Sequence, residues 1–341
     1  MPSQTSPTGP RFADDGVVFV PPFELPPSEF ASPEARAAQA MRAKMPSNAS
    51  GLALDSDISV VRAGLEAMLA PQVERMREVY PVQIAAETMG GVPVQIVTPL
   101  DKSHDPQRLL INLHGGGFSM CAEACALLES IPVAALGAFK VVTVDYRMAP
   151  EASHPAAVQD LEIVYREILK DHAAKSVGIY GCSAGGSLTA QATAWLPEHG
   201  LPMPGAIGIF GAGAVRFSRG DSAYVAAYID GSFPAPAKLG EASTDIGRAY
   251  FGNADMQDRI ISPGLHLDVL AAFPPTLIIT GTRAMDLSPA VYTNSQLIKA
   301  GVKSTLIVGE AMGHCYIYQP HLPEARDAHQ AIVNFFREHL Q

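Results

Sequence analysis

The chain has 341 residues, of which 48% are hydrophobic and 17% charged, a composition that can bury a large core and excludes a disordered protein. Its formal net charge of −10, without any cluster of lysine and arginine, argues against binding of nucleic acid or of an anionic membrane surface. No apolar run is long enough to span a bilayer and no signal peptide is visible, so we expect no membrane span and a cytoplasmic location.

The N-terminal part, residues 1–80, is predicted to form an arm or cap in front of a catalytic domain at 81–341. Its first residues are rich in proline and polar residues, which favours extended or turn conformations. A helix is predicted at 33–44, with Ser32 as its N-cap, and a second helical pattern covers 59–77. A packing arm and a lid over a pocket explain this part equally well.

From residue 82 onward the sequence predicts an α/β fold. Two β-rich runs flank Gly90-Gly91 and predict a hairpin. After it, short apolar runs alternate with helical stretches, which indicates a mostly parallel sheet with helices on both faces. The expected strands are 108–114, 140–147, 176–182, 206–212, 275–280 and 304–310, and the expected helices include 155–171, 184–196, 289–300 and 324–338. The stretch 213–274 is too long for a simple crossover, so we predict a cap insertion there, beside the ligand site.

Four cysteines stand along this chain: Cys121, Cys125, Cys182 and Cys315. They lack the paired short spacings of a zinc site, and a chain of this size needs no disulfides to hold its core. Cys121 and Cys125 are four residues apart and could share a helix face. We expect buried or free thiols in a reducing compartment, and we expect neither a metal nor another cofactor.

The sequence Gly-Cys-Ser-Ala-Gly at 181–185 lies between an expected strand and an expected helix. A serine on such a tight turn needs glycine two residues before and two residues after it, because larger side chains would collide with strand and helix. The turn exposes the Ser183 hydroxyl, and the helix N-terminus behind it favours negative charge on a bound substrate. A plain turn that contains a serine is the alternative, but the context favours Ser183 as a nucleophile.

The sequence His-Gly-Gly-Gly-Phe at 114–118 follows another expected strand. Consecutive glycines can bring bare backbone N–H groups against a ligand, where they would stabilise an oxyanion. A flexible turn and a phosphate cradle are alternatives, but no Gly-Lys-Ser/Thr follows. Phe118 is a candidate substrate-binding residue, although ordinary packing explains it equally well. The candidate oxyanion-hole residues are Gly115, Gly116, Gly117 and Ala184.

A nucleophilic serine needs a histidine as general base and a carboxylate that orients it. His314 follows the last expected strand and would lie on a loop at its carboxyl end. His321 and His329 fall in or near the C-terminal helix, and His266 precedes a strand. We therefore predict His314 as the base.

The acid is expected on the loop after strand 275–280, since the order serine, acid, histidine is typical of such triads. Asp286 is the only carboxylate on that loop. Its charge could instead complement the dipole of the helix that follows. Glu310, four residues before the predicted base, is the alternative acid.

Together these motifs resemble the hormone-sensitive-lipase-like esterases (bacterial family IV) of the α/β-hydrolase superfamily. The resemblance covers about 80–341 and rests on HGGGF, on DYRMAPE at 145–151, on GCSAGG, on a GTR loop and on a Gly-His pair. It implies an α/β-hydrolase core with a helical cap and a serine carboxylesterase that acts on short to medium acyl esters. It also implies that Arg147 and Glu151 brace the active-site loops.

Two positions depart from the family's pattern. Cys182 stands where relatives often have Asp or Thr, and we expect it to pack away from the nucleophile. Ala284 stands directly after GTR, where many relatives carry the acid, so Asp286 must reach His314 by a different loop path. This departure is why Glu310 stays open as an alternative.

The expected partner is a small-molecule ester, and no nucleic-acid partner is expected. Lactonase or amidase activity on the same triad is an alternative function. A non-catalytic ligand-binding protein, like the plant hormone receptors related to this family, is another, although such proteins tend to lose a triad member. If strand 304–310 lies at the edge of the sheet, pairing of two such edges would build a homodimer.

Overall fold

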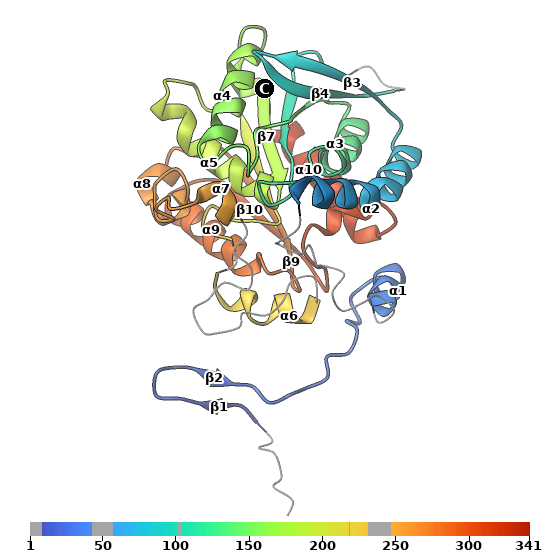
Figure 1. Ribbon diagram of the computed structural model, residues 1–341, viewed down its shortest axis with the longest axis vertical. Coiled ribbons are helices and arrows are strands. Elements are labelled where there is room, and N and C mark those ends of the chain that lie inside the picture. The colour runs from blue at the N-terminus through green and yellow to red at the C-terminus, as the bar shows by residue number, and fades with distance from the viewer. Residues whose placement is uncertain (1–8, 43–56, 101–103, 218, 231–246) are drawn as a thin grey trace, which may run out of the picture.

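An eight-stranded sheet forms the centre of the computed structural model (Figure 1). The structure describes residues 9–42, 57–100, 104–217, 219–230 and 247–341. The strands of the sheet are β3 Val82–Met89, β4 Val92–Pro99, β5 Leu109–Leu113, β6 Lys140–Val144, β7 Val177–Cys182, β8 Ala206–Phe210, β9 Thr276–Gly281 and β10 Ser304–Gly309. Their order is β10-β9-β8-β7-β5-β6-β4-β3, and β5 to β10 run parallel. The expected mostly parallel sheet and the antiparallel hairpin of β3 and β4 are confirmed.

Helices cover both faces of this sheet, which is why its strands are apolar on both sides. In β5, Leu109, Ile111 and Leu113 belong to one hydrophobic cluster and Leu110 to another, because successive side chains point to opposite faces. The covering helices are α3 Ala124–Gly137, α4 Ala156–Ile168, α5 Ala184–Glu198, α9 Leu287–Lys299 and α10 Pro323–His339. Of the helices in the described part of the chain, none combines the length and the apolarity needed to cross a membrane.

The two predicted N-terminal helices are present as α1 Pro33–Arg42 and α2 Ile58–Val79. The predicted cap of α1 is confirmed, since the Ala35 N–H donates to Ser32 Oγ at 3.0 Å. The last two residues expected in this helix lie outside the described residues. In Figure 1 the hairpin of β1 (Arg11–Phe12) and β2 (Val18–Phe19) stands away from the sheet, whereas α2 packs against α3. The division into arm and catalytic domain stays a prediction.

Short helices occur within the stretch predicted as a cap insertion, 213–274. They are α6 Ala226–Asp230, α7 Arg248–Phe251 and α8 Leu267–Leu270. Residues 218 and 231–246 lie outside the described part of the chain, so the cap insertion stays a prediction. The ring of Phe217, at the start of this stretch, packs edge-on against the His314 ring with 5.3 Å between centroids. This stretch therefore contacts the candidate site.

The last strand, β10, lies at one edge of the sheet, as expected. Thr305 and Val308 point outward from it and are exposed. An unpaired strand edge of this kind can pair with the same edge of a second copy. The homodimer stays a prediction.

Candidate active site

The turn between β7 and α5 presents Ser183 in a backbone conformation that is unusual for a side-chain-bearing residue, with φ of 61°. The flanking glycines make this turn possible. A Cβ at Gly181 would come within 2.1 Å of the Leu113 carbonyl oxygen, and one at Gly185 within 1.7 Å of the same atom. Both positions therefore require glycine, as the sequence pattern suggested, and the tight turn leaves Ser183 as the first residue before α5.

His314 lies between Ser183 and Asp286. Its Nε2 is 2.9 Å from Ser183 Oγ, and its Nδ1 is 2.6 Å from Asp286 Oδ1. With the carboxylate as acceptor, Nδ1 carries the hydrogen and Nε2 is left to accept a proton from the serine. Asp286 is completely buried, and its Oδ2 accepts a 2.5 Å hydrogen bond from Thr280 Oγ1. The structure thus brings together the three residues that the sequence proposed as nucleophile, base and acid.

The loop after β9 explains why the carboxylate stands two residues later than in many relatives. Ala284 and Met285 are buried, and the Ala284 N–H donates back to the Gly281 carbonyl in a turn. Asp286 follows as the residue that precedes α9. The alternative acid, Glu310, is exposed and accepts a 2.9 Å hydrogen bond from the Ser28 hydroxyl.

The other histidines considered from the sequence have different surroundings. His266 Nε2 is 2.8 Å from the Gln257 carbonyl oxygen, in an exposed contact. His329 lies within α10, where burial lowers its pKa to about 4, and its ring packs edge-on against Tyr80. Neither contact involves the elbow serine.

The glycine-rich loop after β5 lies against the elbow. Gly116 and Gly117 have φ of 111° and 62°, and a Cβ at Gly116 would meet the Met120 carbonyl oxygen at 1.9 Å. The Gly115 N–H already donates to Glu129 Oε1 at 2.9 Å, so this amide is occupied within the protein. Within the described part of the chain, no hydrogen bond engages the N–H groups of Gly116, Gly117 or Ala184. Of the four candidates, Gly115 is therefore removed from the oxyanion-hole set.

Phe118, the predicted substrate-binding residue, is only 4% exposed. Its ring stacks on Tyr250 at 5.0 Å between centroids and meets Phe251 edge-on at the same separation. Through these contacts the oxyanion loop packs against α7. A direct contact between Phe118 and substrate stays a prediction.

Two ion pairs support the loops around the site. Arg147 pairs with Asp160 of α4, and Glu151 pairs with Arg62 of α2, both at 2.8 Å. Arg62 Nε also donates to the Ser119 carbonyl at 2.7 Å, directly beyond the glycine-rich loop. These contacts give a geometric basis to the bracing that the family resemblance implied for Arg147 and Glu151.

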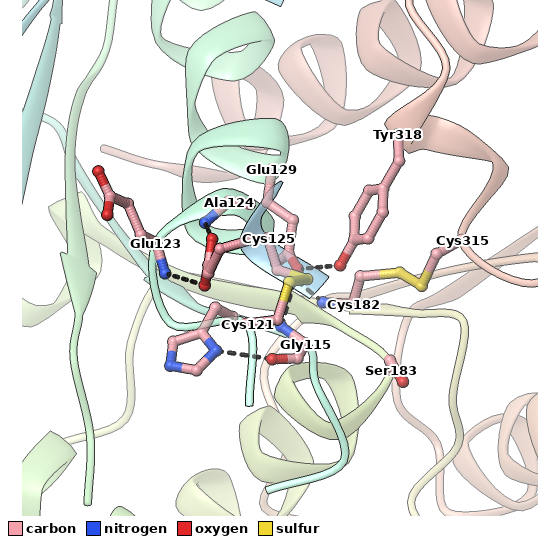
Figure 2. The surroundings of a disulfide bond; sticks show 12 residues. Gly115, Cys121, Glu123, Ala124, Cys125, Glu129, Cys182, Ser183, Cys315 and Tyr318 are labelled. Atoms are coloured by element: carbon pink, nitrogen blue, oxygen red, sulfur yellow. Dashed lines mark hydrogen bonds between the residues drawn. A yellow bond between two sulfur atoms is a disulfide. The ribbon is translucent and has the colours of Figure 1, made fainter. Parts of the chain in front are cut away.

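The expectation of free thiols is wrong, because the four cysteines form two disulfides, Cys121–Cys125 and Cys182–Cys315 (Figure 2). Their Cα atoms are 5.3 and 6.4 Å apart, distances that a disulfide can bridge. Cys121 lies before α3 begins and has φ of 66°, so the shared helix face expected from its spacing to Cys125 is not what joins them. A reducing compartment no longer follows from the cysteines, and a cytoplasmic location stays a prediction.

The Cys182–Cys315 disulfide links the residue directly before Ser183 to the residue directly after His314. Cys182 is completely buried and lies away from the nucleophile, as expected, but it is bonded rather than simply packed. The two cysteines are 133 positions apart in the sequence. A covalent bond therefore joins the elbow to the histidine loop.

Replacing both Cys182 and Cys315 by alanine is expected to lower the free energy of unfolding by more than the same change at Cys121 and Cys125. In the chain-entropy account, a bridge across 133 positions contributes roughly 5 kcal/mol and one across four positions about 2 kcal/mol. Urea unfolding of the two double variants beside the wild type measures the difference. An equal or reversed order would contradict the structural role assigned to the longer bridge.

Comparisons with known proteins agree with this architecture. A family model described as alpha/beta hydrolase fold matches residues 110–318, more than half of the chain. The putative acetyl-hydrolase LipR of Mycobacterium tuberculosis is 28% identical over 285 residues, which are 82% of this chain and 88% of that protein. An acetyl-hydrolase of Streptomyces hygroscopicus is 29% identical over 259 residues, 73% of this chain and 81% of that protein.

Solved structures give the same result over nearly the whole chain. An esterase from the bacterial hormone-sensitive lipase (HSL) family has a TM-score of 0.78 and 25% identity, covering 91% of this chain and 99% of that one. Another solved esterase has a TM-score of 0.79 and 27% identity, covering 95% and 99%. A mostly parallel sheet with a serine at a strand–turn–helix elbow is the architecture of the α/β-hydrolases. The chain belongs to the alpha/beta hydrolase fold family, and its expected resemblance to hormone-sensitive-lipase-like esterases is confirmed.

Proposed function

We propose that this chain is a serine carboxylesterase that hydrolyses short to medium acyl esters, with Ser183 as nucleophile, His314 as general base and Asp286 as the acid. One observation carries the proposal: His314 is within hydrogen-bond distance of Ser183 through one ring nitrogen and of Asp286 through the other. This is the relation that activates a serine hydroxyl, which is a weak nucleophile on its own.

In the proposed reaction, Ser183 Oγ attacks the carbonyl carbon of the ester while His314 Nε2 takes the hydroxyl proton. Asp286 holds the ring in the required tautomer and stabilises the imidazolium that forms. As the tetrahedral intermediate collapses, His314 gives its proton to the departing alcohol and an acyl-serine remains. A water molecule, deprotonated by His314, then attacks the acyl-serine, releases the carboxylic acid and restores the serine.

The oxyanion of each tetrahedral intermediate would bind the N–H groups of Gly116, Gly117 and Ala184. These amides are supplied by the loop after β5 and by the first residue of α5. Donors that are already oriented need no reorganisation when the negative charge develops, which is why such sites lower the barrier strongly. The amide of Gly115 is not part of this proposed set, because it donates to Glu129.

The relatives favour small acyl groups as substrates. Two of them carry the name acetyl-hydrolase, and the solved structures that match are esterases. An acetyl or butyryl ester is therefore the first substrate class to test. Lactones and amides could react through the same three residues, and assays with them separate those alternatives from ester hydrolysis.

We expect the protein to hydrolyse p-nitrophenyl acetate and p-nitrophenyl butyrate, and a fluorophosphonate to label one site per chain. Such probes form a bond only with an activated serine, and mass spectrometry of the digested protein is expected to place the label on Ser183. Absence of both hydrolysis and labelling would contradict the proposal and favour a non-catalytic ligand-binding protein. A label on another serine would contradict the assignment of the nucleophile alone.

A further inference from the structure

A charged residue lies in the middle of the otherwise apolar helix α3. Glu129 is only 2% exposed, and almost every residue of this helix is buried. Burying a carboxylate is costly unless hydrogen bonds replace its water. Burial raises the pKa of Glu129 to about 7, against the opposing effect of its hydrogen-bond donors. An apolar side chain would fill this position at lower cost, so its contacts indicate what the carboxylate does there.

Four donors surround the Glu129 carboxylate and fill its acceptor positions (Figure 2). Oε1 accepts from the Gly115 N–H at 2.9 Å and from the Tyr318 hydroxyl at 2.5 Å. Oε2 accepts from Asn112 Nδ2 at 2.7 Å and from the Cys182 N–H at 3.1 Å. All four partners are neutral donors.

Three of these donors come from the three segments that carry the candidate site. Gly115 directly precedes Gly116, the first of the proposed oxyanion amides. Cys182 directly precedes Ser183 at the elbow. Tyr318 belongs to the short helix at Tyr316–Tyr318 that follows the histidine loop. One buried side chain therefore contacts the oxyanion loop, the nucleophile turn and the histidine loop at the same time.

We propose that Glu129 is a positioning residue for the hydrolytic reaction, which fixes the oxyanion loop, the elbow and the histidine loop relative to one another. It touches neither the substrate nor the reacting atoms and acts through the backbone amides of Gly115 and Cys182. The proposal rests on the function proposed above. Misplacement of reacting groups by about 1 Å can cost a factor of roughly 100 in rate, so a residue that sets these distances has a large effect on kcat.

The two kinds of donor differ in how they respond when the carboxylate is changed. The Tyr318 hydroxyl can rotate and accept a hydrogen bond instead of donating one. The side chain of Asn112 can rotate to exchange its oxygen and nitrogen, because its partner, the Thr143 hydroxyl, can also donate or accept. The N–H groups of Gly115 and Cys182 can only donate. Glu129 matters chiefly as the acceptor for these two amides.

Glu129→Gln tests this arrangement with almost no change in shape. Whichever way the new amide is oriented, its NH₂ group faces either the Gly115 N–H or the Cys182 N–H, so one backbone donor loses its acceptor. We expect kcat per active site for p-nitrophenyl butyrate to fall roughly 10- to 100-fold while KM changes less than about threefold. Glu129→Asp, which keeps the charge but is one methylene too short to reach all four donors, is expected to show the same direction.

Active sites are counted in each variant by complete fluorophosphonate labelling, and thermal unfolding is recorded in parallel. Ser130→Ala serves as the matched control, since Ser130 is the next residue of α3 and is completely buried. It is expected to shift the unfolding temperature and leave kcat per labelled site near that of the wild type. A purely structural Glu129 would lower the number of labelled sites or the unfolding temperature without lowering kcat per site.

The outcomes separate this proposal from the proposed function. If the wild type hydrolyses the ester and Glu129→Gln has the same kcat per labelled site, the positioning role is refuted and the esterase function stands. If Ser130→Ala lowers kcat per site as much as Glu129→Gln does, the effect belongs to packing of α3 and the positioning role is also refuted. If the wild type neither hydrolyses esters nor reacts with the probe, the proposed function fails and the positioning role fails with it.

Discussion

Ser183→Ala is expected to reduce kcat for p-nitrophenyl butyrate by roughly 10⁵- to 10⁶-fold and to abolish labelling by a fluorophosphonate. The change removes the only atom that can form the acyl intermediate, and Ser183 Oγ is the atom within 2.9 Å of His314 Nε2. The oxyanion amides and the substrate pocket stay in place, so the remaining activity is the slow attack of water on a bound ester. Steady-state rates at high enzyme concentration measure the residual kcat.

Ser187→Ala is the matched control for this variant. Ser187 lies in α5, four residues beyond Ser183, and its side chain is almost as buried. The same substitution there leaves the elbow serine in contact with His314, and we expect kcat within about threefold of the wild type. Wild-type hydrolysis by Ser183→Ala would refute the assignment of the nucleophile. Equal losses in the two variants would show that packing of α5, and not the Ser183 hydroxyl, accounts for the effect.

The fold could be predicted largely from the sequence because parallel strands that are buried on both faces appear as continuous apolar runs. The run at 109–113 is an example, since all five of its residues are buried. Gly90-Gly91 marked the hairpin for a different reason: both residues have positive φ, which glycine adopts without strain. Strand positions were therefore predicted to within a few residues.

Helix α3 was not among the helices named from the sequence, and the reason is physical. Every residue of 124–137 except Leu136 is buried, so the segment has no polar face and no period of 3.6 residues to recognise. Glu129 was missed with it. A single carboxylate within an apolar run is a signal in itself, because such a group requires several donors around it. The identity of those donors depends on the tertiary fold.

Contacts between distant loops were only partly predictable. The glycine pattern and the position after β10 were enough to expect Ser183 and His314 on adjoining loops at one edge of the sheet. The Cys182–Cys315 disulfide has no sequence signal, since 133 positions separate its cysteines and neither spacing nor composition relates them. Once the serine and histidine meet, however, their neighbours in sequence are brought within bonding distance. The disulfide therefore follows from the same loop contact.

Asp286→Asn is expected to lower kcat for p-nitrophenyl butyrate by roughly 10³- to 10⁴-fold. If the new amide presents its NH₂ to His314 Nδ1, the histidine carries its hydrogen on Nε2 and cannot accept the serine proton. If the amide presents its oxygen instead, the tautomer is kept but the negative charge that stabilises the imidazolium is lost. Thr280 Oγ1, the other partner of the carboxylate, can donate or accept and so tolerates either orientation.

Glu310→Gln is the control that separates the two carboxylates considered from the sequence. Glu310 is exposed and contacts the Ser28 hydroxyl, so its neutralisation is expected to change kcat by less than about threefold. A large loss in Glu310→Gln together with a small loss in Asp286→Asn would move the acid to the loop just before His314. The buried contact of 2.6 Å between Asp286 and His314 would then have to be a structural hydrogen bond, and the ring would need another partner to hold its tautomer during catalysis.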